Sequence, residues 1–339
     1  MVDDVPVHGH SEIDVEQMNA ASLKAHVSKA GSFFLKSRLV SFLLLACVLI
    51  AVTLFVHRSF SGFTRSDFSS ISIRSLVTPL ALICLAYLNR FAFWVVLTSS
   101  FELRASVFLT SRAFFYSLLG RYIPGNAGLF LFRIRAYKAG SQKKVGAALI
   151  TEYISTILAA CVLVIAGTLF IPVSNPLLTK LIPGSMLVLL LVLLHPPVLK
   201  RTINSLLKLM GKEQLDVFPA IRIVLAVTAG YILTGMLHGL AMFLLLRMLT
   251  PMGLASYPIV TGAYYMAGLV GMFAFFAPGG IGVREGVLFL LLPFVAGAQP
   301  VVLAAALMRV LTLCSELLLF ASSSVLYLLY ERRRICNEK

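Results

Sequence analysis

Two Pro-Gly clusters, each accompanied by arginine, have the residue types and spacing that favour binding of a polar or anionic group. The first is GRYIPGNAG, residues 120–128, with Arg121 before the cluster's proline and Arg133 shortly after it. Pro124 lacks a backbone N–H and Gly125 tolerates backbone angles that other residues resist. We therefore expect a sharp turn here that leaves backbone polar groups free to meet a ligand.

The second cluster is APGGIGVREG, residues 277–286. Its elbow consists of Pro278, Gly279, Gly280 and Gly282, followed by Arg284 and Glu285. We expect a short apolar helix to begin at Val287, and the free N–H groups and dipole of a helix start favour an anion. The spacing fits neither a Walker loop nor a dinucleotide-binding fingerprint, so no nucleotide site is expected.

Charged residues also occur inside apolar stretches, where each costs about 2.5–3.5 kcal/mol to insert and usually marks a ligand path. These residues are Arg90, Arg112, Arg121, Glu152, Arg284, Glu285, Arg309 and Glu316. Glu316 lies seven residues after Arg309 and so on the same helix face, which leaves an internal ion pair as one reading. Even with every glutamate paired, two arginines remain, and a phosphate-bearing headgroup is their simplest partner.

Other polar residues carry less chemistry. Tyr264 and Tyr265 suit a membrane-interface belt, and His238, between Gly235 and Gly239, suits close helix packing. The 5 cysteines show no CxxC spacing, and no HExxH or Ser-His-Asp pattern is defensible. We expect no metal, no cofactor and no catalytic site.

Composition places these residues in a membrane. Of 339 residues, 59% are hydrophobic and 13% are charged, against about 25% charged in soluble domains. At about 20 residues per span, the chain has room for roughly six to nine membrane elements and none for a soluble catalytic domain. The net charge of +15 is read as basic cytoplasmic loops rather than as a nucleic-acid surface.

The predicted fold class is an all-α polytopic membrane protein with six transmembrane helices and two broken or re-entrant helical elements. The six spans are residues 39–56, 76–98, 145–171, 181–199, 223–246 and 301–330. The broken elements are residues 105–132 and 257–296, because no continuous helix tolerates their Pro-Gly clusters. They belong to a transmembrane domain, residues 38–331, between a partly disordered leader (1–37) and a basic tail (332–339).

Charge placement predicts the orientation. With both termini cytoplasmic, most lysines and arginines fall in cytoplasmic segments; Arg133 is counted among these. Three full spans separate the broken elements, so these enter the membrane from opposite faces. Opposed broken helices are typical of transporters built from inverted repeats.

These motifs resemble the lysylphosphatidylglycerol synthase transmembrane-region family, also described as flippase-like domains, over roughly residues 39–330. The resemblance carries over to the residues of both clusters named above, to Arg133 and to Glu152. It implies headgroup-binding roles for the cluster residues and Arg133, whereas Glu152 is expected in the intramembrane charge network. It also implies movement of a lipid between leaflets. The chain has no synthase domain, so lysyl transfer by the chain itself is not expected.

Three functions stay open. The first is a translocase for a phosphate-bearing lipid such as an aminoacyl-phospholipid, glycolipid or polyprenyl lipid in a bacterial inner membrane. The second is a non-catalytic subunit supporting an envelope-lipid biosynthetic enzyme. The third is an intramembrane enzyme acting on a headgroup, with Glu285 or Glu316 as general base. Anionic lipids are the expected partners, an envelope-lipid enzyme or a second copy of the chain stays open, and nucleic acid is not expected.

Overall fold

The computed structural model describes residues 72–103, 105–122, 127–170, 184–185, 187–192, 194–209, 213–274 and 278–337. All of them belong to one compact unit, Phe55–Lys339. The leader and the span expected at residues 39–56 lie outside the described residues, as do Pro124 and Gly125.

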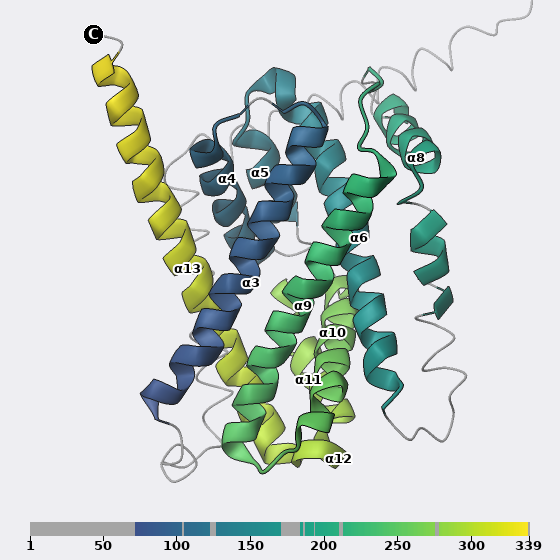
Figure 1. Cartoon of the computed structure of the whole chain (residues 1–339), viewed down its shortest axis with the longest axis vertical. Coiled ribbons are helices and arrows are strands. Elements are labelled where there is room, and N and C mark those ends of the chain that lie inside the picture. The colour runs from purple at the N-terminus through teal and green to yellow at the C-terminus, as the bar shows by residue number, and fades with distance from the viewer. Residues whose placement is uncertain are drawn as a thin grey trace, which may run out of the picture. The chain divides into compact units, whose positions relative to one another are not determined.

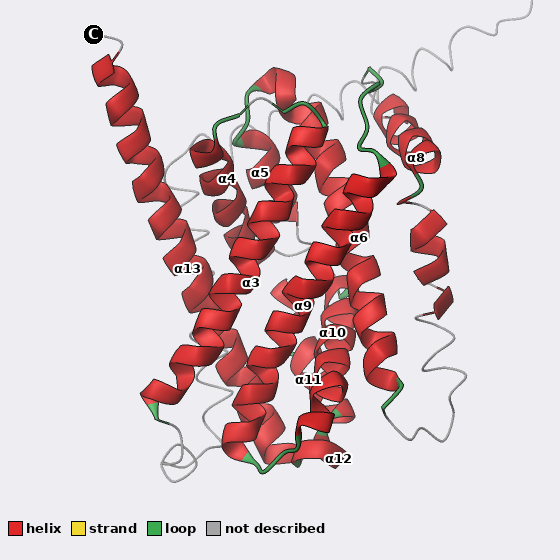
Figure 2. Ribbon diagram, viewed as in Figure 1, coloured by secondary structure: helices red, strands yellow, loops and turns green. Residues whose placement is uncertain are grey.

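Four long helices carry the fold (Figure 1): α3 (Ile73–Ser100), α6 (Gln142–Thr168), α9 (Ile221–Leu249) and α13 (Ala298–Asn337). Each contains a stretch long and apolar enough to cross a membrane. The 27 residues of α6 extend about 40 Å at 1.5 Å per residue, longer than the roughly 30 Å hydrocarbon core. The described residues contain no strand (Figure 2). This part of the chain is therefore an all-helical, multi-pass membrane protein, and four of the six predicted spans are confirmed as long apolar helices.

The span expected at residues 181–199 lies partly outside the described residues, and its described part is not one of these four helices. Its described residues 187–192 are helical, and a separate helix, α8 (Pro196–Leu209), then begins at the Pro-Pro pair, because proline suits the first turn of a helix. It buries Leu199, Ile203 and Leu207 on one side and exposes Lys200 and Arg201 on the other. Such an amphipathic helix suits the membrane interface better than a full crossing.

The first broken element is a helical hairpin. Helix α4 (Val107–Leu119) ends in a short 3-10 turn, η1 (Gly120–Tyr122), and α5 (Ala127–Arg135) returns alongside α4. A Cβ atom at Gly120 would lie 2.4 Å from the backbone of Gly128. Only glycine fits there, so the two arms of the hairpin meet closely at its tip.

The second broken element has the same design. Helix α10 (Tyr257–Phe273) is followed by η5 (Pro278–Gly280) and by α11 (Val283–Leu291), which packs against α10. Gly279, Gly280 and Gly282 have φ of 60°, 70° and 84°, values that disfavour any residue with a side chain. The start predicted at Val287 is wrong, because this left-handed turn ends at Gly282 and lets the helix begin four residues earlier.

That earlier start alters the expected anion site. Glu285 now lies in the first turn of α11, and its Oε2 accepts a hydrogen bond of 2.7 Å from the backbone N–H of Gly282. A carboxylate is the group that the positive end of a helix favours. The chain therefore supplies its own anion at this helix start.

Small residues bring α10 into close contact with two long helices. A Cβ atom at Gly167 of α6 would lie 2.7 Å from Cα of Gly262, and one at Gly239 of α9 would lie 2.3 Å from Oγ1 of Thr261. Membrane helices pack through small residues because backbones then approach closely. The packing role predicted for Gly239 is thus confirmed.

The two hairpins point toward one another. In Figure 1, α4 and α5 lie near the end of the bundle where α13 ends, whereas α12 (Pro293–Ala296), which follows α11, lies near the opposite end. The tips η1 and η5 are in contact. A Cβ atom at Gly279 would lie 3.4 Å from the Tyr122 ring. The two clusters therefore meet where the backbone of Gly279 packs against the ring of Tyr122.

Candidate functional site

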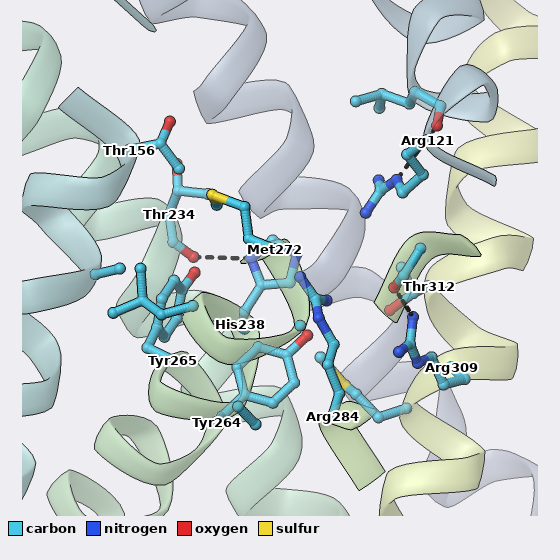
Figure 3. A pocket seen from close by; sticks show the side chains of 18 of the residues that line it. Arg121, Thr156, Thr234, His238, Tyr264, Tyr265, Met272, Arg284, Arg309 and Thr312 are labelled. Carbon is cyan, nitrogen blue, oxygen red and sulfur yellow. Dashed lines mark hydrogen bonds between the residues drawn. The ribbon is translucent and has the colours of Figure 1, made fainter. Parts of the chain in front are cut away.

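A cavity of about 180 Å³ lies beside the meeting point of the hairpins. Since one buried water needs roughly 10–15 Å³, the cavity has room for about a dozen waters or for a headgroup-sized ligand. Its polar lining comes from Tyr87, Arg90, Arg121, Tyr153, Thr156, Tyr231, Thr234, His238, Tyr264, Tyr265, Arg284, Glu285, Arg309 and Thr312. Figure 3 shows Arg121, Arg284 and Arg309 gathered at this cavity.

The tip of the first hairpin is bound to α13 through a buried carboxylate. Arg121 forms an ion pair with Glu316, whose side chain is 0% exposed. The same Oε1 of Glu316 accepts a hydrogen bond of 2.6 Å from the hydroxyl of Tyr87, and Oε2 accepts one of 3.3 Å from Tyr122. This carboxylate is therefore fully engaged in holding the tip.

The tip of the second hairpin is bound to α13 through an arginine. Arg309 donates from Nε to Glu285 at 2.7 Å, and from its two terminal nitrogens to the carbonyls of Gly279 at 3.1 Å and Gly280 at 3.2 Å. The backbone groups that this turn presents to α13 are carbonyls, not the N–H groups expected from the sequence, and a guanidinium of the chain itself satisfies them.

Arg309 and Glu316 do not pair with each other. Both face the hairpin tips from α13, but their separation of two helical turns corresponds to about 10 Å along the axis. Each side chain instead reaches the tip nearest to it. The internal ion pair, one reading of the sequence, is wrong for this structural reason.

A third charge cluster surrounds Glu152 of α6. Its Oε1 accepts from Nε and Nη2 of Arg90 at 3.1 and 3.0 Å, and its Oε2 accepts from Arg133 at 2.5 Å. Arg133 is fully buried between the rings of Trp94 and Phe114, 4.6 and 4.4 Å from their centroids. It does not line the cavity.

The placement predicted for Arg133 is corrected, and Arg112 lies away from the cavity lining. Arg133, counted among cytoplasmic loop residues, is buried because Glu152 and two aromatic faces compensate its charge. Arg112, placed in the intramembrane network, is exposed on α4 and lies 4.7 Å from the ring centroid of Tyr327. Neither position was accessible from hydropathy, because both arginines occur in similarly apolar sequence.

Arg284 differs from the other arginines of the cavity. Its side chain lies along the glycine face of α10: a Cβ atom at Gly271 would lie 2.6 Å from its Cγ, and one at Gly268 would lie 3.8 Å from Nη2. Figure 3 shows it between Tyr264 and Arg309. Among the described residues, no carboxylate lies within ion-pair distance of it, and its buried Nε has no hydrogen-bond partner.

The cavity also contains residues to which the sequence assigned other roles. Tyr264 and Tyr265, expected at the membrane interface, line it, as does His238, whose Nδ1 lies 2.9 Å from the carbonyl oxygen of Thr234. The one available signal for the missed Tyr87 was its position one helical turn before Arg90, which places both on one face of α3.

Of the residues predicted to bind a headgroup, Arg121, Gly279, Arg284 and Glu285 line the cavity. Pro278, Gly280 and Gly282 form the turn that positions them. In the described part of the chain, no group of His, Cys, Asp and Glu residues is placed to hold a metal ion.

The chain matches no model of a known protein family, and a search of curated proteins gives no match. The resemblance noted in the sequence motifs thus stays a prediction.

Proposed function

We propose that this protein is a lipid translocase that moves a phosphate-bearing lipid between membrane leaflets. The observation that carries the proposal is Arg284, a partly buried cation whose buried Nε has no hydrogen-bond partner and which has no counterion among the described residues, in a cavity where two opposed helical hairpins meet. A buried charge is costly unless it is paired. A phosphate oxygen is a strong partner for a guanidinium, and the resemblance to flippase-like domains supports the same reading.

The headgroup lies in the cavity while the acyl or prenyl chains stay in the surrounding lipid. Arg284 contacts the phosphate, and the hydroxyls of Tyr264, Tyr265 and Thr234 offer further hydrogen bonds to it or to its substituent. The hairpins enter the membrane from opposite faces as re-entrant elements, so the cavity beside their tips lies between the two leaflets. Six full spans surround them, and both termini are cytoplasmic, in a bacterial inner membrane.

The test is lipid transfer by the purified full chain in proteoliposomes, followed with a fluorescent phospholipid whose outer-leaflet fraction is quenched chemically. Arg284→Ala is expected to lower the transfer rate by about a hundredfold, comparable to the effect of removing one charge-stabilising donor from an enzyme site. Arg112→Ala is the matched control, because it removes the same charge at an exposed position on α4.

Transfer by Arg284→Ala at the wild-type rate would show that the site assignment is wrong. A wild-type protein that transfers no lipid, and that always purifies with a second protein in fixed ratio, would favour the supporting-subunit role instead.

A further inference from the structure

The charges around the cavity do not balance. In the described interior, Arg90, Arg121, Arg133, Arg284 and Arg309 face only Glu152, Glu285 and Glu316. With His238 neutral, five positive charges meet three negative ones. The excess of two is a property of the folded site, because Arg112 lies outside it and Arg133 inside it.

The excess is located at two positions. Glu316 compensates Arg121, and Glu285 compensates Arg309. Glu152 is shared between Arg90 and the fully buried Arg133, so that it neutralises one of the two.

The second uncompensated charge is Arg284. Arg90 and Arg284 both line the cavity, whereas Arg133 does not. Arg90 uses Nε and Nη2 on Glu152, and no described group accepts a hydrogen bond from its Nη1. The buried Nη2 of Arg133 also has no partner, but Arg133 does not line the cavity, so a ligand there meets the surplus of this cluster through Arg90. Both surplus charges are therefore available to a ligand in the cavity.

A ligand is bound best when it removes the whole excess, because an uncompensated charge in a low-dielectric interior is costly. A phosphodiester headgroup carries one negative charge and would leave one arginine unneutralised. A phosphomonoester carries close to two at neutral pH, and a diphosphate diester carries two. We propose that the cavity selects lipids whose phosphate headgroup bears two negative charges, an inference that rests on the proposed headgroup site.

The test is native mass spectrometry of the full chain in detergent with an equimolar mixture of three lipids with identical acyl chains. Phosphatidylglycerol is the singly charged probe, phosphatidic acid the phosphomonoester, and CDP-diacylglycerol the diphosphate diester. At pH 7.5 we expect at least one doubly charged lipid to be retained over phosphatidylglycerol by about tenfold or more, the size of one additional charge-assisted contact.

Acidification separates the two sources of double charge. A phosphomonoester loses its second charge below pH about 6, whereas the diphosphate diester keeps both. At pH 5 we therefore expect the preference for phosphatidic acid to vanish and any preference for CDP-diacylglycerol to persist.

Arg284→Gln should reduce the preference for the doubly charged lipid to near unity, because one surplus charge is gone. Arg90→Gln is expected to have the same effect, since Glu152 would then be paired with Arg133 alone. Arg112→Gln should keep the wild-type preference.

Equal retention of all three lipids by the wild type would overturn charge selection. If the wild type nevertheless transfers lipid and Arg284→Gln abolishes the transfer, the proposed translocase function stands and only the charge selectivity is wrong. A wild type that retains doubly charged lipids but transfers none would contradict the proposed function and leave the selectivity intact.

Discussion

At the scale of single residues, the site depends on which arginine lacks a partner rather than on how many arginines are present. Arg121 and Arg309 line the cavity as Arg284 does, yet each has a carboxylate within ion-pair distance. These two arginines stabilise the fold, because removing either member of an arginine–glutamate pair would leave the other charge unpaired. Arg284 is held by shape instead, in the groove left by Gly268 and Gly271.

This dependence on shape predicts a strong effect from one methyl group. Gly271→Ala would place a Cβ atom 2.6 Å from Cγ of Arg284 and displace the guanidinium. We expect lipid transfer to fall about tenfold or more, because misplacing a positioning group by about 1 Å is that costly.

Gly286→Ala is the matched control for this change. It lies in the same helix as Arg284, two residues further on, and its Cβ atom would meet nothing within 4 Å. The measurement is the lipid transfer rate of each variant in proteoliposomes. Equal rates for Gly271→Ala and Gly286→Ala would contradict the role of Gly271 in positioning Arg284.

Glu152 predicts a contrast between buried and exposed ion pairs. Glu152→Gln leaves Arg90 and Arg133 without a carboxylate, and we expect the free energy of unfolding to fall by about 3–5 kcal/mol. Glu213→Gln removes an ion pair of 2.7 Å with Lys143 in which the glutamate is 91% exposed. That change should leave stability unaltered, because water solvates both charges.

Denaturation of the two purified variants in the same detergent measures this contrast. Equal stability of both would show that the buried cluster is not structural. Lys143 also lowers the pKa of Glu213 by donating a hydrogen bond to it. The small contribution of this pair therefore disappears only when the pH falls through that lowered pKa.

At the scale of elements, α13 connects the two hairpins. Glu316 binds the tip of α4–α5, and Arg309 binds the tip of α10–α11, two turns apart on one helix. Each hairpin is interrupted where a helix would otherwise satisfy its own backbone groups. The charged side chains of α13 therefore stabilise conformations that the hairpin sequences do not stabilise alone.

This arrangement predicts that the two charges act on different hairpins. Glu316→Gln should raise amide hydrogen exchange in α4 and α5 by about tenfold, the effect of losing one charge-assisted contact. Arg309→Gln should do so in α11 and at the end of α10. Exchange measured by mass spectrometry on the full chain tests this, and an increase spread evenly over both hairpins in either variant would argue against separate tethers.

At the scale of the whole molecule, the described basic residues gather at one end of the bundle. Lys138 follows α5, Lys143 and Lys144 lie in the first turn of α6, and Arg222 and Arg332 lie near the start of α9 and the end of α13. At the opposite helix ends stand only Arg74 and Arg247 among the described residues. By the positive-inside rule, this distribution predicts that the first end faces the cytoplasm.

That assignment predicts the accessibility of two single cysteines in a chain whose five native cysteines are replaced. Gly140→Cys precedes α6 and Gly253→Cys follows α9, and a Cβ atom at either position would contact nothing within 4 Å. In whole cells an impermeant maleimide should label position 253 and leave position 140 unlabelled until the membrane is opened. The reverse pattern would invert the proposed orientation.

The sequence by itself determined the class of the protein and the places where its helices break. Twenty or more apolar residues per segment require membrane helices, and Pro-Gly clusters interrupt them whatever surrounds them. For the same local reason the sequence identified the glycines of the second cluster as a turn, with Arg284 directly after it. The structure also describes the first broken element as a hairpin, although Pro124 and Gly125 themselves lie outside the described residues.

Only the tertiary structure decided which charges meet. Arg309 and Glu316 share a face but pair with different hairpins, and Glu152 compensates a residue that the sequence placed in a loop. Ion pairing depends on distances between helices far apart in the chain, which hydropathy and spacing do not encode. The free charge of Arg284, and with it the candidate site, is what remains after those distant pairs have formed.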